Sequence, residues 1–308
     1  MTGRFAPSPT GDLHLGNLRT ALVAWLAARS RQASFLVRME DLDRVTSSPE
    51  HERRQLYDLA RLGLDHDGVV VRQSERFPLY EAALDRLEQL GVTYPCWCTR
   101  REIREAAAAP HDGALRYPGT CRELGRRRLE ERRASGRRPA LRLDAGSATA
   151  CLGIGSELEI VDLVAGTYRT GVDDLVLRRN DGVPAYHVAV VVDDDAQGVT
   201  EVVRGDDLLA VTPSQVLLQR LLGLTTPTYA HVPLAVDPLG ERLAKRHGAV
   251  TLSDLARLGV DDRTVLARLL HSLGVDTGGG PIDLRTIADR FDVTALARDR
   301  RPWVVGDL

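Results

Sequence analysis

The chain has 308 residues, of which 43% are hydrophobic and 27% charged, and its formal net charge is −2. This composition suits one large or two modest globular domains with a real core, and it excludes an intrinsically disordered chain. The N-terminus lacks a basic stretch followed by an apolar one, and no window of about 20 apolar residues occurs. We therefore expect a cytoplasmic protein without a membrane span. A net charge near zero gives no whole-protein field that would attract a polyanion.

The first 90 residues alternate between short apolar runs and amphipathic segments. Residues 3–6 and 35–39 are expected to be strands, and a helix is expected after the loop 7–11. The pair Ser48-Pro49 is a typical helix start, because proline fits the first turn of a helix. Alternating strands and helices predict an α/β fold built on a parallel sheet.

The pattern changes after Gly91 and returns near residue 183, so we interpret residues 91–182 as an inserted domain. The run 186–192 is continuously apolar, which is typical of a central strand in a parallel sheet. Residues 212–215 have the sequence Thr-Pro-Ser-Gln, the pattern of a capping box, and should begin a helix that Gly223 ends. Residues 251–308 have helical spacing and predict a small helical domain.

Positive charge is concentrated in part of the predicted insertion. Between residues 96 and 140 there are twelve arginines and six acidic residues, a local excess of six positive charges. Such a stretch is a candidate nucleic-acid contact. The alternative is an arginine-rich helix that faces only solvent, and the residues themselves leave both interpretations open.

Three of the four cysteines lie close together in the sequence, as Cys96, Cys98 and Cys121. In a chain without an export signal, thiols or metal ligands are better explanations than a disulfide framework. Three thiolates and one further ligand would make a tetrahedral zinc site, and His111 is the more ordinary fourth ligand. Buried free thiols are the alternative. Cys151 stands apart and is expected in the core.

A candidate phosphate site follows the first predicted strand, in the tetrapeptide from His14 to Asn17. Gly16 lets a flat group approach the backbone, the N-terminus of the next helix favours anions, and His14 can donate to a phosphate. A tetrapeptide of this kind occurs often by chance. The alternative is that His14 only caps the helix or lies on the surface.

The chain contains forty arginines and one lysine, Lys245, within the segment 242–248. A basic loop of this kind is usually only solvated. A compact and movable ammonium, however, suits a phosphate group that changes position better than a planar guanidinium does. We therefore predict that Lys245 contacts phosphate.

Several longer segments together resemble one known family. Residues 4–22 look like the first signature of the glutamyl class I aminoacyl-tRNA synthetases, and 243–246, Leu-Ala-Lys-Arg, resemble their second signature. The second signature differs at two positions, because Arg242 stands where a lysine is commoner and Ala244 where a small hydroxyl residue is commoner. Further segments agree in order along nearly the whole chain, namely 38–43, 72–75, 177–182, 186–194 and 203–206.

The resemblance implies an enzyme that activates L-glutamate with ATP and Mg²⁺ as glutamyl-adenylate. His14 and Lys245 would be the catalytic residues, and both would bind ATP together with Gly16 and Asn17. Arginine can hold a carboxylate through two parallel bonds, and a glutamate at the end of a strand suits the ammonium of an amino acid. The glutamate pocket would be formed by Arg4, Phe5, Ala6, Pro7, Ser8, Glu40, Tyr186 and Arg204.

The cysteine spacing resembles that of the glutamyl-Q tRNA(Asp) synthetases, a shortened branch of this family, and implies a structural Zn²⁺ held by Cys96, Cys98, Tyr117 and Cys121. The implied fold is a Rossmann-like catalytic domain (1–90 and 183–250), an inserted α+β zinc and acceptor-binding domain (91–182) and a helical stem-contact-like domain (251–308). No anticodon-binding domain is expected.

Members of the shortened branch transfer glutamate to queuosine at the wobble position of tRNA(Asp). The expected partners are therefore L-glutamate, ATP and queuosine-containing tRNA(Asp), with no membrane, and the expected form is a monomer. Three alternatives remain open: a truncated enzyme that charges a tRNA 3′ end, a ligase of the same superfold that joins a carboxylate to a small amine, and a binding protein without activity.

Overall fold

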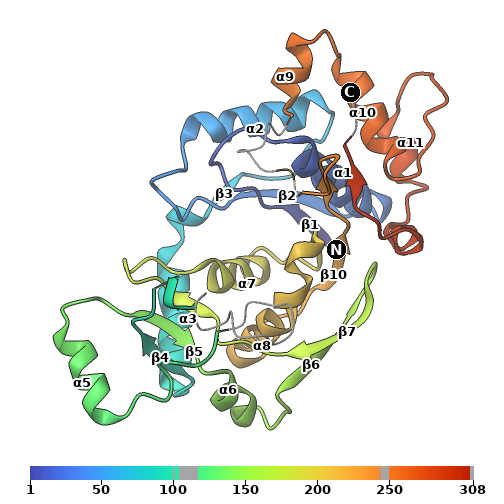
Figure 1. The fold of residues 1–308 in the computed structure, drawn as a ribbon. Coiled ribbons are helices and arrows are strands. Elements are labelled where there is room, and N and C mark those ends of the chain that lie inside the picture. The colour runs from blue at the N-terminus through green and yellow to red at the C-terminus, as the bar shows by residue number, and fades with distance from the viewer. Residues whose placement is uncertain (100, 104–116, 242, 244–249, 306–308) are drawn as a thin grey trace.

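The computed structural model describes residues 1–99, 101–103, 117–241, 243 and 250–305. Its central feature is two sheets, built mainly of parallel strands, that meet edge to edge (Figure 1). The first contains β1 (Thr2–Phe5), β2 (Ser34–Met39) and β3 (Val71–Arg72). The second has the order β7-β6-β10-β9, formed by β6 (Glu157–Asp162), β7 (Gly166–Gly171), β9 (Glu201–Gly205) and β10 (Thr228–Val232).

The edges of the two sheets meet between β1 and β9. The backbone N–H of Thr200 donates to the carbonyl oxygen of Thr2 at 2.9 Å, and Arg4 Nη1 donates to the carbonyl oxygen of Val203 at 3.1 Å. Within the second sheet only β7 runs antiparallel to its neighbour. The predicted parallel α/β architecture is thus confirmed.

Helix α1 (Leu15–Ser30) packs against this seam, and its residues from Ala21 to Ala28 are all buried. Such all-round burial explains why the helix shows little amphipathic pattern. Helices α2 (Pro49–Arg61) and α3 (Phe77–Gln89) follow in the chain, and Ser48 caps α2 as the sequence predicts.

The run 186–192 is a helix and not the strand that the sequence predicted. Helix α7 (Tyr186–Ala196) packs between α3 and α8 (Thr212–Leu222), and its central residues are buried. A helix with apolar neighbours on nearly every side has the same continuous apolar run as a buried strand.

The predicted capping box at 212–215 is also wrong. Helix α8 has Val211 at its N-cap, and no side chain caps it. Gly223 ends α8 in the left-handed conformation with φ 70°, as predicted.

The segment between the two sheets holds a third, antiparallel sheet of β4 (Thr93–Cys96), β5 (Ala140–Leu143) and β8 (Val176–Arg178). Among the described residues of this segment, α5 (Arg126–Ala134) and α6 (Ala145–Cys151) accompany the sheet. The register pairs Asp162 of β6 with Tyr229 of β10, so β6 lies in the second sheet although the predicted insertion includes its residues.

Short helices follow the parallel sheets, namely α9 (Leu252–Arg257), α10 (Asp262–His271) and α11 (Leu284–Ala288), and they lie beside α1 at one end of the molecule (Figure 1). The chain returns through β12 (Trp303–Val304), which pairs with β11 (Ala235–Val236). Short 3₁₀ helices span Gln73–Glu75, Asp206–Val211 and Val293–Arg298. Among the described helices, none combines the length and apolar character that crossing a bilayer requires.

Candidate active site

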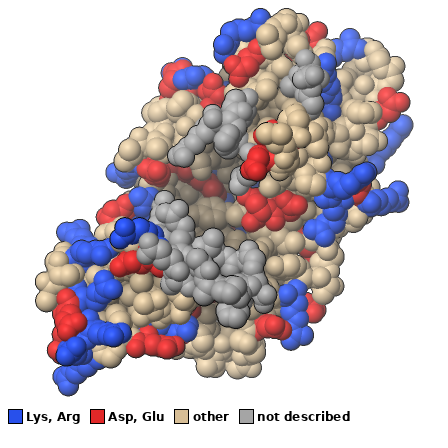
Figure 2. Space-filling model, in the orientation of Figure 1, with Lys and Arg blue, Asp and Glu red and all other residues tan. Residues whose placement is uncertain are grey.

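A cleft of about 720 Å³ opens where the carboxyl ends of β1 and β9 meet. In an open α/β sheet this is where ligands bind, because the loops that follow neighbouring strands diverge there. The face shown in Figure 2 is hollowed between the two halves of the molecule, with acidic side chains on its edge.

The structure brings most of the predicted site residues to this one cleft. All eight residues predicted for the glutamate pocket line it, together with His14, Gly16 and Asn17 of the predicted phosphate site. Lys245 lies outside the described residues, as do Arg242, Ala244 and His111. Separate segments of the chain supply the lining, and their meeting could not be predicted from any one of them.

Buried ion pairs fix the floor of the cleft. Arg4 donates from Nε to Asp194 Oδ1 at 3.3 Å, and Arg38 donates from Nη1 to the same oxygen at 2.8 Å. Asp193, the preceding residue of α7, accepts from Arg76 at 2.6 Å and from Tyr80 at 2.8 Å. Two adjacent acids of α7 therefore bind the first sheet to the helix layer.

Glu40 lies just after β2 with its side chain 12% exposed, and it forms an ion pair with Arg38 at 3.5 Å. Burial raises the pKa of Glu40, and the positive charges of Arg38 and Arg4 only partly oppose this effect. A cation placed in the cleft would stabilise the ionised form of this carboxyl.

Arg204 is buried on the opposite wall. Its Nε donates to His231 Nε2 at 3.1 Å, and its Nη2 donates to Thr212 Oγ1 at 2.7 Å and Gln215 Oε1 at 2.6 Å. Its guanidinium also lies over the ring of Tyr229, 5.2 Å from the centroid. Among the described residues, the groups that bind Arg204 are therefore uncharged, unlike the carboxylates that bind Arg4 and Arg38.

His14 caps helix α1 at the other end of the cleft. Its Nδ1 accepts from the backbone N–H of Asn17 at 3.2 Å, and Asn17 Oδ1 accepts in return from the backbone N–H of His14 at 3.3 Å. The capping role that the sequence left as an alternative is thus present. Because the cap uses Nδ1, it also fixes the orientation of the ring beside the cleft.

Gly16 is required by close packing. A Cβ at this position would lie 3.0 Å from His14 Cε1, 3.1 Å from His14 Nδ1 and 3.2 Å from Ala235 Cβ. The glycine therefore lets the imidazole fold back over the first turn of α1.

The two described residues that flank 244–249 are both attached near this cleft. Leu243 lines it, and the N–H of Leu243 donates to the carbonyl oxygen of Ala235 at 3.4 Å. Val250 accepts a hydrogen bond from the N–H of Leu15 at 3.1 Å, next to His14.

Sequence reasoning missed several residues that shape the cleft. Gln55 of α2 is buried, and its amide nitrogen donates to the carbonyl oxygens of Ser8 at 3.0 Å and Gly11 at 2.7 Å, so it holds the loop between the two predicted subsites. His231, Thr212 and Gln215 were missed because their role depends on how β9, β10 and α8 pack. No local pattern in the sequence indicates that these residues bind Arg204.

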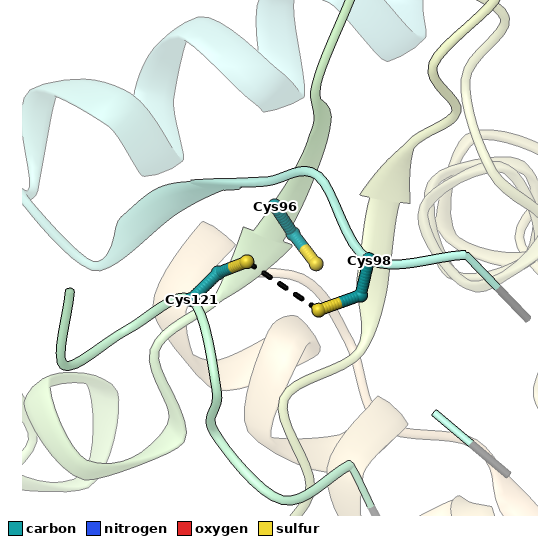
Figure 3. A group of neighbouring side chains, drawn as sticks. All are labelled: Cys96, Cys98 and Cys121. Atoms are coloured by element: carbon teal, nitrogen blue, oxygen red, sulfur yellow. Dashed lines mark hydrogen bonds between the residues drawn. The ribbon is translucent and has the colours of Figure 1, made fainter. Parts of the chain in front are cut away.

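The three clustered cysteines meet in space as predicted (Figure 3). Their sulfur atoms lie within 4.8 Å of one another, with Cys98 and Cys121 3.4 Å apart. The Tyr117 hydroxyl lies 3.3 Å from the sulfurs of Cys96 and Cys98. Four ligands at zinc-bond length on a tetrahedron are about 3.8 Å apart, so these donors fit a zinc ion. Cys151 is exposed, and its predicted place in the core is wrong because it ends the short helix α6.

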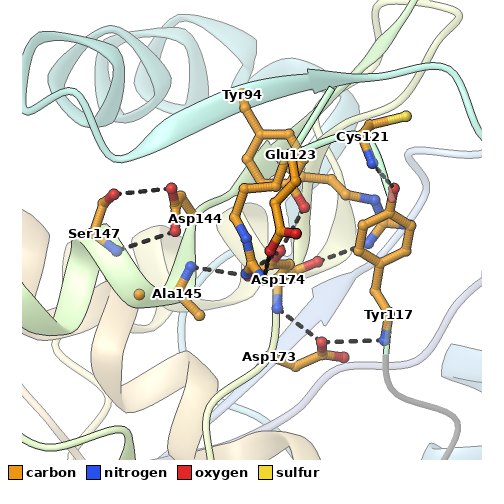
Figure 4. Close-up of polar contacts among 12 residues, drawn as sticks. Tyr94, Tyr117, Cys121, Glu123, Asp144, Ala145, Ser147, Asp173 and Asp174 are labelled. Carbon is orange, nitrogen blue, oxygen red and sulfur yellow. Dashed lines mark hydrogen bonds and ion pairs between the residues drawn. The ribbon is translucent and has the colours of Figure 1, made fainter. Parts of the chain in front are cut away.

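Two adjacent acids, the half-buried Asp173 and the buried Asp174, connect the cysteine cluster with helix α8 (Figure 4). Asp173 accepts from the backbone N–H of Tyr117 at 3.3 Å, while its own N–H donates to Ser214 Oγ of α8 at 2.9 Å. The neighbouring Asp174 accepts from Tyr94 at 2.5 Å and from Arg122 at 3.0 Å. The loop that carries Tyr117 is thereby attached to the helix that holds Arg204.

Helix α5 projects from this region, and none of its residues is buried (Figure 1). It carries five arginines and two glutamates, and two of the arginines form exposed i,i+4 pairs with those glutamates, Arg126 with Glu130 and Arg127 with Glu131. Exposed pairs of this kind contribute little to stability. The helix therefore presents a net positive surface that the fold itself does not use.

Comparison with known proteins places the chain in a family. The family described as tRNA synthetases class I (E and Q), catalytic domain, matches residues 1–295. A glutamyl-Q tRNA(Asp) synthetase of Nocardia farcinica is 55% identical over 99% of this chain and 93% of its own length. A protein of the same name from Cutibacterium acnes is 52% identical over 92% of this chain and 78% of its own length.

A crystal structure of glutamate-tRNA synthetase from Elizabethkingia anophelis has the same fold. It superposes with a TM-score of 0.76 at 24% identity, over 99% of this chain and 68% of that one. The family match, the relatives and the fold agree with one another. The chain therefore belongs to the class I tRNA synthetases (E and Q), and within that family it groups with the glutamyl-Q tRNA(Asp) synthetases.

Proposed function

We propose that the protein activates L-glutamate with ATP and transfers the glutamyl group to queuosine at the wobble position of tRNA(Asp). In the first step a carboxylate oxygen of glutamate attacks the α-phosphorus of ATP, and the bond to the bridging oxygen breaks as pyrophosphate leaves. In the second step a hydroxyl of the modified base attacks the glutamyl carbonyl, and AMP leaves. The observation that carries this proposal is the single cleft where the predicted glutamate and phosphate residues meet.

Charge balance assigns the two walls of the cleft to the two ends of glutamate. Arg4 and Arg38 already have Asp194 as a counterion, whereas Arg204 is bound by uncharged groups. A buried guanidinium without a counterion favours a carboxylate in the cleft. On the other wall, Glu40 accepts the substrate ammonium, whose charge would lower the pKa that burial has raised.

ATP lies at the other end of the cleft, with its phosphates near the N-terminus of α1. The helix dipole and the first backbone N–H groups favour an anion there, and His14 donates to a phosphate oxygen. Lys245 stabilises the departing pyrophosphate from the segment whose ends are attached at Leu243 and Val250. Mg²⁺ accompanies ATP. No protein nucleophile is needed, since catalysis rests on positioning and charge stabilisation.

Zn²⁺ would be held by Cys96, Cys98, Cys121 and the Tyr117 oxygen, where it serves a structural purpose. Four protein ligands leave no open position for a substrate, as is usual for structural zinc. The metal would connect residues 96–98 with residues 117–121, which also meet through Asp174, the acceptor of hydrogen bonds from Tyr94 and Arg122.

The tRNA would lie across the basic helix α5, whose exposed arginines attract phosphates without reading sequence. In this arrangement residues 1–90 and 183–250 form the catalytic domain, to whose second sheet β6 and β7 add two strands. The rest of 91–182 forms the inserted zinc and acceptor-binding domain, and 251–308 form a helical domain that contacts the tRNA stem. The enzyme acts as a cytoplasmic monomer.

Exchange of labelled pyrophosphate into ATP tests the activation step. We expect exchange that depends on glutamate and needs no RNA. Absence of exchange with glutamate, or an equal rate with glutamine or aspartate, would refute the proposal. Exchange that requires tRNA would favour a truncated enzyme of the kind that charges a tRNA 3′ end.

A further inference from the structure

His231, one of the residues that hold Arg204 in place, is itself held by a buried carboxylate. His231 of β10 is the direct register partner of Arg204 on β9, so their side chains lie next to each other on one face of the parallel pair. Both His231 and Asp162 of β6 have fully buried side chains, and His231 Nδ1 lies 2.6 Å from Asp162 Oδ2. Neighbouring strands therefore supply a continuous chain from Asp162 through His231 to Arg204.

Asp162 is ionised in this setting. Its carboxylate accepts from the backbone N–H groups of Val164 at 2.9 Å, Ala165 at 2.7 Å and His231 at 3.1 Å, besides the imidazole. Burial would raise the pKa of Asp162, but the hydrogen bonds from His231 and the backbone outweigh it, and the pKa is lowered. An ionised Asp162 requires a proton on Nδ1 of His231, so Nε2 is an acceptor.

His231 is also neutral. Burial lowers the pKa of His231, and the positive charge of Arg204 lowers it further, whereas the hydrogen bond to Asp162 opposes both effects. A neutral imidazole accepts a hydrogen bond from the Nε–H of Arg204 at its Nε2. Because the imidazole carries no negative charge, it does not neutralise the guanidinium. Thr212 and Gln215 add two more uncharged acceptors.

We infer that His231, oriented by Asp162, is a positioning residue that sets the preference of Arg204 for a carboxylate over an amide. The inference rests on the proposed function, because it concerns how the glutamate pocket excludes glutamine. If Arg204 were held by an acid, as Arg4 is, its charge would be neutralised and a neutral side-chain amide would bind nearly as well. Holding the guanidinium by neutral acceptors fixes its orientation and keeps its charge for the substrate.

Two substitutions of His231 separate this role from simple packing. His231→Asn places an amide near the position of Nδ1, which retains the bond to Asp162 and removes the acceptor for Arg204. His231→Gln places its oxygen near the position of Nε2 and retains that acceptor. Loss of one buried hydrogen bond to a charged group is expected to raise the KM for glutamate about tenfold in His231→Asn. His231→Gln should recover most of this loss.

Asp162→Asn gives an independent, nearly isosteric test. The amide oxygen would take the backbone N–H groups, and its NH₂ would face Nδ1 of His231. The proton would then move to Nε2, opposite the Nε–H of Arg204, and the KM for glutamate should rise as in His231→Asn.

The measurement is glutamate-dependent pyrophosphate exchange by wild type and the three variants, with glutamine as the competing substrate and the midpoint of thermal unfolding recorded for each. His231→Asn and Asp162→Asn should each lower the ratio of kcat/KM for glutamate over glutamine about tenfold, with the KM for ATP little changed. Equal selectivity in all four folded proteins would overturn the inference. Absence of exchange by wild type would instead overturn the proposed function.

Discussion

The backbone N–H of Leu15 donates to the carbonyl oxygen of Val250 at 3.1 Å, and His14 and Thr251 form an isolated antiparallel bridge beside it. Leu15 begins α1, and Val250 is the first described residue after the segment that contains Lys245. Leu243, the described residue that precedes 244–249, lines the same cleft, so both described ends of this segment are held near His14. We therefore expect Lys245 to act close to His14.

Replacement of Lys245 should affect the rate of activation more than substrate binding. Lys245→Met removes the charge that stabilises departing pyrophosphate, and we expect kcat for exchange to fall about 100-fold or more with little change in the KM for glutamate. Lys245→Arg, which keeps the charge in a planar group, should retain a larger part of the rate. Steady-state exchange kinetics measure both. A large rise in the KM for glutamate without a fall in kcat would contradict this role.

Gly16→Ala should damage ATP use while leaving the fold intact. Its methyl group would lie 3.0 Å from the His14 ring, and the ring would have to move from its place over the first turn of α1. We expect a lower kcat and a higher KM for ATP. Gly155→Ala is the matched control, since an added Cβ there has no neighbour within 4 Å. Equal kinetics for the two variants would show that the ring position does not matter.

The purified protein should contain about one zinc ion per chain, bound by the Cys96, Cys98 and Cys121 cluster. Cys121→Ser should lose the metal and unfold at a lower temperature. Cys151→Ser alters an exposed cysteine away from the cluster and should retain the metal. Elemental analysis and thermal unfolding decide the matter. Full zinc content in Cys121→Ser would refute the ligand set.

Acid should destabilise the protein in part through His187. Burial, and then the charge of Arg204, lowers the pKa of His187 to about 4. The unfolded chain takes up this proton near pH 6.5 and the folded chain only near pH 4, so the free energy of unfolding falls as the pH falls through this window. His231 contributes with the same sign.

His187→Gln removes the titrating group, so denaturant unfolding at pH 8, 6.5 and 5 should show a smaller loss of stability than in wild type. His66→Gln makes the same substitution at another half-buried histidine and is the matched comparison. The same pH dependence in wild type and His187→Gln would show that His187 is not the source.

The parts of the site that lie on continuous segments could be predicted from the sequence. Residues 4–8 and 14–17 are such segments, and the structure places them along one cleft. The meeting of the three cysteines followed from the resemblance, because ligands of one zinc ion must converge. Their spacing alone also allowed separate buried thiols.

Other features could not be predicted because they depend on packing between distant elements. The run 186–192 is apolar on all sides, so its period could not distinguish the helix α7 from a strand. Thr212 and Gln215 have the spacing of a capping box, but in the structure they hold Arg204, which lies on a neighbouring strand. His231 gained its role only from the β9 and β10 register.

Transfer of labelled glutamate to tRNA(Asp) tests the central claim most directly. The comparison uses tRNA(Asp) with queuosine, the same tRNA without it, and the queuosine form lacking its 3′-terminal adenosine. We predict that both queuosine forms accept glutamate and that the unmodified tRNA does not. Equal charging with and without queuosine, or loss of charging with the terminal adenosine, would contradict the account.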